Sequence, residues 1–207
     1  MKITNTEVYG IRHAMRGMRN PFESHDKSDT IRETIGVSDL ELAQMLVLGG
    51  NEHGKFMRQI KVWADLDLPR YIWSELDTYH YNTKNSESTM HKLFRMDREI
   101  DVDDFYTEGM STGDRYILNQ TIFNLNEIRK DWIASGKKFE HVRRAKRILP
   151  ETFLQLRTMD TNYAELRNIY FQRRHHRLKD EWGVIIKWIE SLPYAKELIT
   201  IEKKENN

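Results

Sequence analysis

The stretch AKRILPETFLQLRTMDTNYAELRNIYFQRR, residues 145–174, decides the fold expected of this chain. Pro150 ends a basic helix predicted over residues 139–149, because proline cannot continue a helix. Residues 151–158 alternate between apolar and polar side chains, which is typical of a half-buried strand. From Asp160 a helical stretch is predicted to run to about residue 190, with a possible break near the adjacent histidines. A helix, a strand and a helix in succession indicate a mixed α and β fold.

Upstream segments extend this prediction towards a mainly helical protein. Ser38-Asp39-Leu40-Glu41 has the capping-box pattern, and the helix that it opens is expected to stop at Gly49-Gly50. Residues 56–63 alternate as a second strand would, and Pro69 suits the first turn of a helix running towards Tyr79. Ser111 or Thr112 is expected to cap a long helix reaching about residue 135. We therefore predict one mainly helical α+β domain over residues 1–207, with a frayed tail from about residue 201.

Composition excludes several kinds of site. The chain has no cysteine, which removes disulfides, thiolate metal ligands and cysteine nucleophiles. Its 33 Lys and Arg balance 32 Asp and Glu, so no overall positive field attracts nucleic acid. Apolar runs are much shorter than the roughly 20 residues of a membrane span, and we expect a soluble, cytoplasmic protein. His175 and His176 point about 100° apart on a helix, and no metal site is expected.

Two basic stretches leave three interpretations open. The first is a solvent-exposed helix face. The second is an anion clamp, in which arginine guanidinium groups bind phosphate through paired hydrogen bonds. The third is a nucleic-acid-binding surface with aromatic side chains on which bases stack. The neutral net charge argues against the third. The segment TYHYNTKNSEST, residues 78–89, is dense in hydrogen-bonding side chains, as loops that line ligand pockets often are. The basic residues are Arg143, Arg144, Lys146, Arg147, Arg173, Arg174, Arg177 and Lys179.

Two segments together resemble the flavin-dependent thymidylate synthases (the ThyX type). AKRILP, residues 145–150, is similar to the family's ARxVLP element, and the ungapped continuation places Asn162, Asn168, Arg173 and Glu181 on family positions. In the N-terminal half, Glu52-His53 resembles the family's EH element.

The family signature RHRxxSxNExSxRY falls on residues 79–92. His80 and Glu87 are kept at their places in it, and Thr89 replaces a serine. Tyr79 and Tyr81 stand where the family has arginines, and Lys146 stands for the arginine of ARxVLP. Lys84, Lys92 and Arg70 are near enough in sequence to be candidates for restoring the lost charge, and Arg12, Arg16, Arg19 and His25 are further candidates.

The resemblance implies a mainly helical α+β fold around a small mixed or antiparallel sheet. It also implies a homotetramer with sites at subunit interfaces, a bound FAD, and reductive methylation of dUMP to dTMP. Methylenetetrahydrofolate would supply the carbon, and NADPH would reduce the flavin. Because the lost arginines help to hold flavin and nucleotide in the family, a diverged homologue that binds a pyrimidine nucleotide or flavin without making dTMP is the alternative.

Residue roles also follow from the resemblance. Arg173 would be catalytic, stabilising the anion that forms when N3 of the uracil loses its proton. The expected substrate-binding residues are Glu87, Ser88, Thr89, His91, Lys146, Arg147 and Arg173. The expected cofactor-binding residues are His53, Tyr79, His80, Tyr81, Glu87, Asn162 and Asn168.

Overall fold

The computed structural model describes residues 1–203, and contacts within the chain divide them into two compact units. Unit 1 comprises residues 1–2, 66–78 and 85–157. Unit 2 comprises residues 3–65, 79–84 and the chain from residue 158 onward. Both units are built from separated segments, and each is described by itself below. The prediction of one domain over residues 1–207 stays a prediction.

A four-stranded antiparallel sheet has the order β1-β2-β4-β3, which confirms the small sheet that the resemblance implies. Its strands are β1 (Lys2–Tyr9), β2 (Lys61–Pro69), β3 (Thr83–Ser86) and β4 (Leu154–Asn162). Every second residue of β2 from Val62 to Leu68 is buried, as the period of a strand requires. The rest of the chain is mainly helical, so the predicted α+β class is also confirmed.

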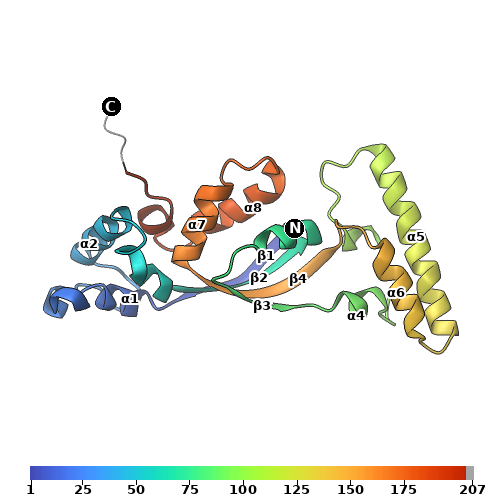
Figure 1. Cartoon of the computed structure of the whole chain (residues 1–207), viewed down its shortest axis with the longest axis horizontal. Coiled ribbons are helices and arrows are strands. Elements are labelled where there is room, and N and C mark those ends of the chain that lie inside the picture. The colour runs from blue at the N-terminus through green and yellow to red at the C-terminus, as the bar shows by residue number, and fades with distance from the viewer. Residues whose placement is uncertain (204–207) are drawn as a thin grey trace. The chain divides into compact units, whose positions relative to one another are not determined.

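Unit 1 is dominated by two helices that lie side by side, α5 (Thr112–Ala134) and α6 (Phe139–Ile148) (Figure 1). Ser111 and Asp114 form a reciprocal capping box at the start of α5, which confirms the predicted cap. Gly136 takes a φ of 74° in the turn, a conformation that suits glycine. The short helices of unit 1 are α3 (Arg70–Leu76) and α4 (Thr89–Leu93). A continuous apolar core joins α4, α5 and α6, with Leu125 and Phe153 fully buried.

Unit 2 packs α2 (Val37–Leu48), α7 (Tyr163–Arg173) and α8 (Lys179–Glu190) together with shorter turns. Those turns are α1 (Ile11–Gly17), the 3-10 helix η3 (Gly54–Gln59) and the π-helical turn η5 (Ala195–Ile199). Trp182 and Tyr163 are the largest fully buried side chains of this unit. The break between α7 and α8 falls at the histidines, as the sequence allowed.

Three predicted boundaries are wrong. Gly54–Gln59 is a 3-10 helix, so the strand expected from residue 56 begins only at Lys61. β4 begins at Leu154 rather than at residue 151, and it continues through Asp160 to Asn162, so the helix expected from Asp160 begins at Tyr163. Over so few residues, the spacing of apolar side chains fits both the period of a strand and the period of a helix. Hydrogen-bond pairing within the sheet therefore decides where each strand begins and ends.

The capping box expected at Ser38 is also wrong. The helix begins at Val37, with Gly36 as its N-cap and no side-chain cap. Asp39 is fully buried, and its carboxylate accepts hydrogen bonds from Arg19 at 2.6 Å and from the Ser28 and Thr30 hydroxyls. This carboxylate therefore organises the segment that precedes α2. Arg19 is committed to it and is removed from the candidates for restoring charge.

The tail predicted to fray from about residue 201 lies partly outside the described residues, since residues 204–207 are not described. Ile201 and Glu202 are bonded to α7 and its C-cap residue: the Ile201 carbonyl accepts from Arg167, and Glu202 pairs with Arg174 at 2.7 Å. Within residues 1–203, no helix has the length and apolar character needed to cross a bilayer.

Candidate functional site

A cavity of about 330 Å³ in unit 2 is bounded by the end of α2, by η3, by Tyr81 and by one face of α7. We call it the α7 cavity. Segments more than 100 residues apart in sequence meet around it. Its lining residues are Val47, Gly50, Asn51, Gly54, Met57, Arg58, Tyr81, Asn162, Ala164, Glu165, Arg167, Asn168 and Phe171.

The first turn of α7 supplies the polar wall. Asn162 is the N-cap of the helix, and its Oδ1 accepts from the Glu165 N–H at 3.1 Å. The Asn162 amide also donates to the Tyr81 carbonyl at 3.4 Å, while the Glu165 carboxylate accepts from the Tyr81 N–H at 3.4 Å. The backbone of Tyr81 is thus held by the start of α7. Asn168 follows on the same helix face and is exposed.

Two arginines give the α7 cavity its positive charge. The Arg58 guanidinium lies 5.7 Å from the centre of the Tyr81 ring, which is itself 64% exposed. Arg167 lies over Phe171 at 4.5 Å and donates to the carbonyls of Ile199 and Ile201. Burial lowers the pKa of Arg167. Arg58 therefore places a cation beside the position where the resembling signature has its second arginine.

Neither arginine was among the residues predicted for the site. Arg58 lies in the segment expected to be a strand, where a charged residue facing outward is ordinary and does not indicate a binding site. Arg167 directly precedes Asn168, and its place on the same helix as two predicted residues was a signal that could have been used.

A second cavity of about 410 Å³ in unit 2 is lined by the basic residues at the junction of α7 and α8. We call it the junction cavity. The Arg173 guanidinium lies 4.8 Å from the Trp182 ring and 5.6 Å from the Tyr79 ring. Its Nε donates to the Tyr79 hydroxyl at 2.8 Å. The anion-clamp interpretation of the second basic stretch stays a prediction, and Arg174 within that stretch pairs with Glu202 at 2.7 Å. The lining residues are Arg173, Arg174, His175, His176, Lys179, Trp182, Gly183 and Ile186.

The other predicted cofactor residues of unit 2 take different places. His80 is exposed and lines a smaller cavity of about 260 Å³ together with Tyr81 and Asn162. Tyr79 is buried, 6% exposed, and turns towards Arg173 rather than lining the α7 cavity. His53 is exposed at the start of η3 and is not part of the α7 cavity's lining.

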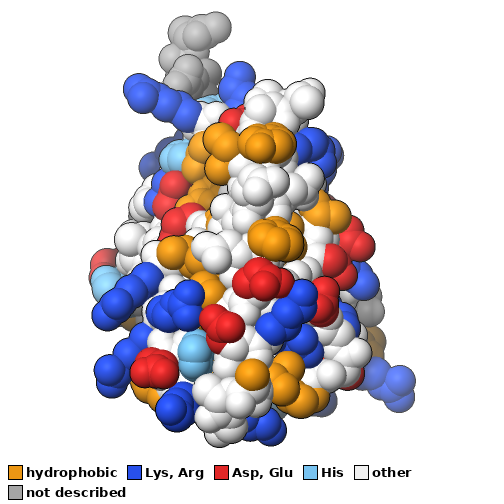
Figure 2. All heavy atoms as spheres, turned by 90° about the vertical axis from the view of Figure 1, so that its right-hand side faces the viewer, with side chains coloured by type: hydrophobic (Ala, Val, Ile, Leu, Met, Phe, Trp, Pro, Cys, Tyr) orange, Lys and Arg blue, Asp and Glu red, His pale blue; other side chains and the backbone are white. Residues whose placement is uncertain are grey.

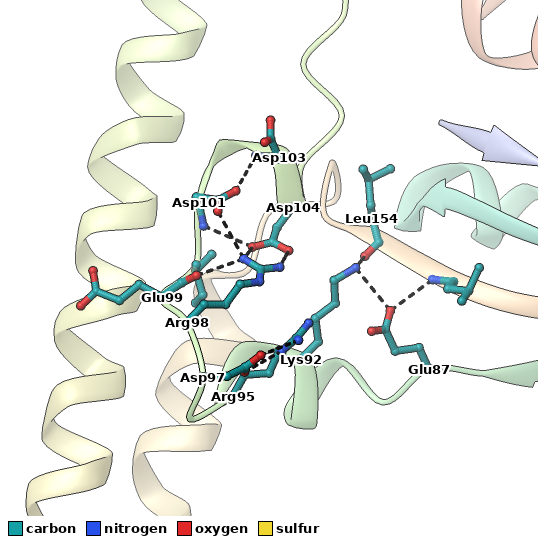
Figure 3. A network of polar contacts seen from close by, with 12 residues as sticks. Glu87, Lys92, Arg95, Asp97, Arg98, Glu99, Asp101, Asp103, Asp104 and Leu154 are labelled. Atoms are coloured by element: carbon teal, nitrogen blue, oxygen red, sulfur yellow. Dashed lines mark hydrogen bonds and ion pairs between the residues drawn. The ribbon is translucent and has the colours of Figure 1, made fainter.

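The predicted substrate residues of the signature lie in unit 1, where the chain itself uses two of them. Glu87 accepts from the Leu156 N–H at 3.3 Å and pairs with Lys92 at 3.3 Å (Figure 3). The Ser88 hydroxyl caps α4 by accepting from the His91 N–H at 3.4 Å, and Thr89 begins that helix.

Charge compensation by the neighbours of the signature is only partly available. Lys92, besides its pair with Glu87, donates to the Leu154 carbonyl at 2.9 Å, and Arg70 pairs with Glu151 at 3.2 Å. Both are therefore engaged within unit 1. Lys146 and Arg147 are exposed in the last turn of α6.

Solved structures with a similar fold include flavin-dependent thymidylate synthases. The ThyX enzyme from Helicobacter pylori, crystallised with FAD and dUMP, superposes with a TM-score of 0.72 at 16% identity, over 97% of this chain and 98% of that one. A second structure described as ThyX from Helicobacter pylori with FAD and dUMP gives 0.72 at 17% identity, over 97% of each chain. The UMP/dUMP methylase PolB from Streptomyces cacaoi, bound to 5-Br dUMP, gives 0.62 at 17% identity, over 96% of this chain and 95% of that one.

Sequence comparison alone finds no such relation. No family model matches the chain, and no curated protein sequence matches it significantly. The changed signature residues agree with that result, because both arginines of the motif are replaced here although His80 and Glu87 are kept. Over 97% of its length, the chain has the fold of the flavin-dependent thymidylate synthases.

Proposed function

We propose that this protein is a flavin-dependent thymidylate synthase or a close variant, which methylates dUMP reductively to dTMP. Methylenetetrahydrofolate and NADPH are the proposed co-substrates. The observation that supports this proposal most directly is the α7 cavity, because Tyr81, Asn162 and Asn168 line it together. These residues come from two motifs about 80 residues apart, and both motifs were assigned to flavin on resemblance alone.

The residues of the α7 cavity fit a flavin. Asn162 and Asn168 carry amides that both donate and accept, as the polar edge of an isoalloxazine ring requires. Tyr81 and Phe171 offer aromatic faces, and Arg58 offers a cation for phosphate. The bound flavin would supply the electron pair for the reduction. The protein's part is to hold the ring on the Asn-bearing face of α7.

Arg173 is the proposed catalytic residue. A guanidinium stays protonated at every working pH, so it can stabilise a uracil anion without losing its own charge. The rings of Trp182 and Tyr79 lie beside it and limit its movement. We assign Glu87, Ser88, Thr89 and His91 to nucleotide contacts, and Lys146 and Arg147 to the phosphate, as the resemblance implies.

A homotetramer with sites at subunit interfaces is part of the same proposal. Unit 1 supports it with large apolar side chains exposed on α5, where Tyr116, Ile117 and Phe123 are each about two-thirds exposed. Figure 2, which faces α5, shows hydrophobic side chains at the surface among charged ones of both signs. Association of copies would remove this apolar surface from water.

The alternative is a diverged homologue that binds a flavin or a pyrimidine nucleotide without making dTMP. Tyr79 and Tyr81 favour it, because neither carries the positive charge of the signature arginines. The methylase PolB, described as acting on UMP and dUMP, indicates that this fold serves more than one uridylate. We therefore include UMP among the candidate substrates.

The test is the visible absorption spectrum of the purified protein before and after FAD is added and the sample desalted. We expect a retained flavin band, NADPH oxidation that depends on dUMP and methylenetetrahydrofolate, and dTMP as product. A flavin band without dTMP formation would favour the diverged homologue. A protein that stays colourless after FAD is added would contradict both flavin-binding readings.

A further inference from the structure

The hydroxyl of Tyr79 joins Arg173 to the α7 cavity through a chain of hydrogen bonds. It accepts from Arg173 Nε at 2.8 Å and lies 3.1 Å from Gln172 Oε1, to which it donates. The Gln172 Nε2 in turn donates to Asn168 Oδ1 at 2.7 Å. One hydroxyl group can accept one of these bonds and donate the other, so its capacity matches both partners.

We propose that Tyr79 is a positioning residue, which fixes the plane of the Arg173 guanidinium and links it to the cofactor-facing Asn168. Tyr79 is almost completely buried, so its hydroxyl is held by packing rather than by solvent. Water competes poorly for such a group, and a hydrogen bond between it and a charged donor is stronger than a neutral one. The inference rests on the proposed function, since only a ligand at Arg173 gives this fixed plane a use.

The change from arginine to tyrosine at position 79 acquires a physical reason from this geometry. A second guanidinium within hydrogen-bond distance of Arg173 would repel it, whereas a hydroxyl oxygen accepts from it and a ring lies beside it. Tyrosine at this position thus holds Arg173 through both its hydroxyl and its ring.

The test replaces Tyr79 with phenylalanine, which keeps the ring and removes the oxygen. In the FAD-loaded full chain we expect Y79F to lower kcat about tenfold, with KM for dUMP changed less than about threefold. A hydrogen bond to a charged group accounts for a change of that size. Gln172→Met keeps the Tyr79–Arg173 bond but removes both the acceptor for the Tyr79 hydroxyl and the donor to Asn168, and it should lower kcat by about threefold. Y170F is the matched control, because Tyr170 lies on α7 with Arg173 but its hydroxyl donates to Glu190 instead.

A readout independent of turnover is the exchange of the Arg173 Nε proton with water, followed by nitrogen-15 NMR of the free protein and assigned with R173K. We expect slow exchange in the unmodified protein and in Y170F, and at least tenfold faster exchange in Y79F. Equal exchange rates in the unmodified protein and Y79F would overturn the proposal. An unchanged kcat in Y79F would also overturn the proposal. A lower thermal midpoint of Y79F together with loss of its FAD would overturn it as well.

Failure of the proposed function is a separate result. A protein without turnover in which the Nε proton is protected by Tyr79 would contradict the synthase and still support the positioning. Should Y79F fail to fold, Q172M provides the test. Faster exchange of the Arg173 Nε proton together with a reduced kcat in Q172M would support the proposal. If Q172M changed neither the exchange rate nor kcat, the proposal would be overturned.

Discussion

Two groups of charged side chains, one in each unit, have different surroundings. In unit 1, Arg98 bonds both oxygens of the buried Asp104, and Lys92 pairs with Glu87 (Figure 3). In unit 2, Arg58 and Arg173 lie against aromatic rings and line cavities. A cation that meets a buried carboxylate of its own chain stabilises the fold, as Arg98 does here and as Arg19 does with Asp39 in unit 2. We propose that Arg58 and Arg173, which lie against rings beside cavities, serve ligand binding instead. The predictions below test this difference, from the largest expected effect to the smallest.

Removing Arg173 should have the largest effect, and it should fall on activity. We expect Arg173→Ala to lower kcat for dTMP formation by about 100- to 1,000-fold, the usual cost of one lost donor to a developing anion. The thermal midpoint should change little, because the buried core of unit 2 does not include this side chain. Stopped-flow and steady-state kinetics measure the first quantity and calorimetry the second. Arg177→Ala, an exposed basic residue nearby, is the control; turnover persisting in R173A would remove Arg173 from the mechanism.

Removing Asp104 should act on stability instead. We expect Asp104→Asn to lower the free energy of unfolding by about 2–3 kcal/mol, the range for hydrogen bonds to charged groups. Asp97→Asn is the matched control, because Asp97 pairs with Arg95 but is exposed. Urea denaturation monitored by circular dichroism gives both values. Equal losses in the two variants would show that burial of the pair is irrelevant.

The same pair predicts a pH dependence. Burial acts to raise the pKa of Asp104, but hydrogen bonds from Arg98 and the Asp101 backbone outweigh it and hold the pKa below its usual value. A carboxyl with a depressed folded pKa stabilises the protein above its unfolded pKa of about 3.9. That contribution is lost as the pH falls through the folded pKa. The acid limb of the stability curve should therefore be shallower in D104N, and an unchanged limb would contradict the assignment.

A smaller effect is expected at the cavity wall. Asn168→Ala should weaken FAD binding by about tenfold, because the proposed hydrogen bond to the flavin and the bond from Gln172 would be lost. Titration by quenching of flavin fluorescence measures the dissociation constant. Asn124→Ala, an exposed asparagine of α5, should leave that constant unchanged. If N168A bound FAD as tightly as the unmodified chain, the assignment of the α7 cavity as the flavin site would be contradicted.

The smallest effect is expected at the exposed end of α6. Lys146→Ala should change the free energy of unfolding by less than about 0.5 kcal/mol, as exposed substitutions usually do. It should weaken dUMP binding by roughly threefold at low salt and less at high salt, because exposed charges are screened. Isothermal titration at two ionic strengths checks this, with Lys130→Ala on α5 as the control. A salt-independent loss would point to a buried contact instead.

Local chemistry predicted those elements whose signals are contained within a few residues. Ser111 and the turn at Gly136 bound α5 as expected, because caps and left-handed turns depend on neighbours in sequence. β1 and β3 were not predicted. Both are short or largely exposed, so their side chains show no apolar alternation. Ser38 carried the pattern of a cap, but the fold uses Asp39 and its partner Arg19, 20 residues away.

For the candidate site, the sequence by itself placed Asn162 and Asn168 six positions apart on one helical stretch, which limits how far apart they can lie. That Asn162 is the N-cap of this helix followed only from the structure. Only the tertiary structure decided what faces them. Arg58 and Tyr81 reach the α7 cavity from segments remote in sequence, and Tyr79 meets Arg173 across 94 positions. Such pairings depend on how buried surfaces pack together. The local spacing of apolar residues in the sequence does not indicate which distant segments pack against one another.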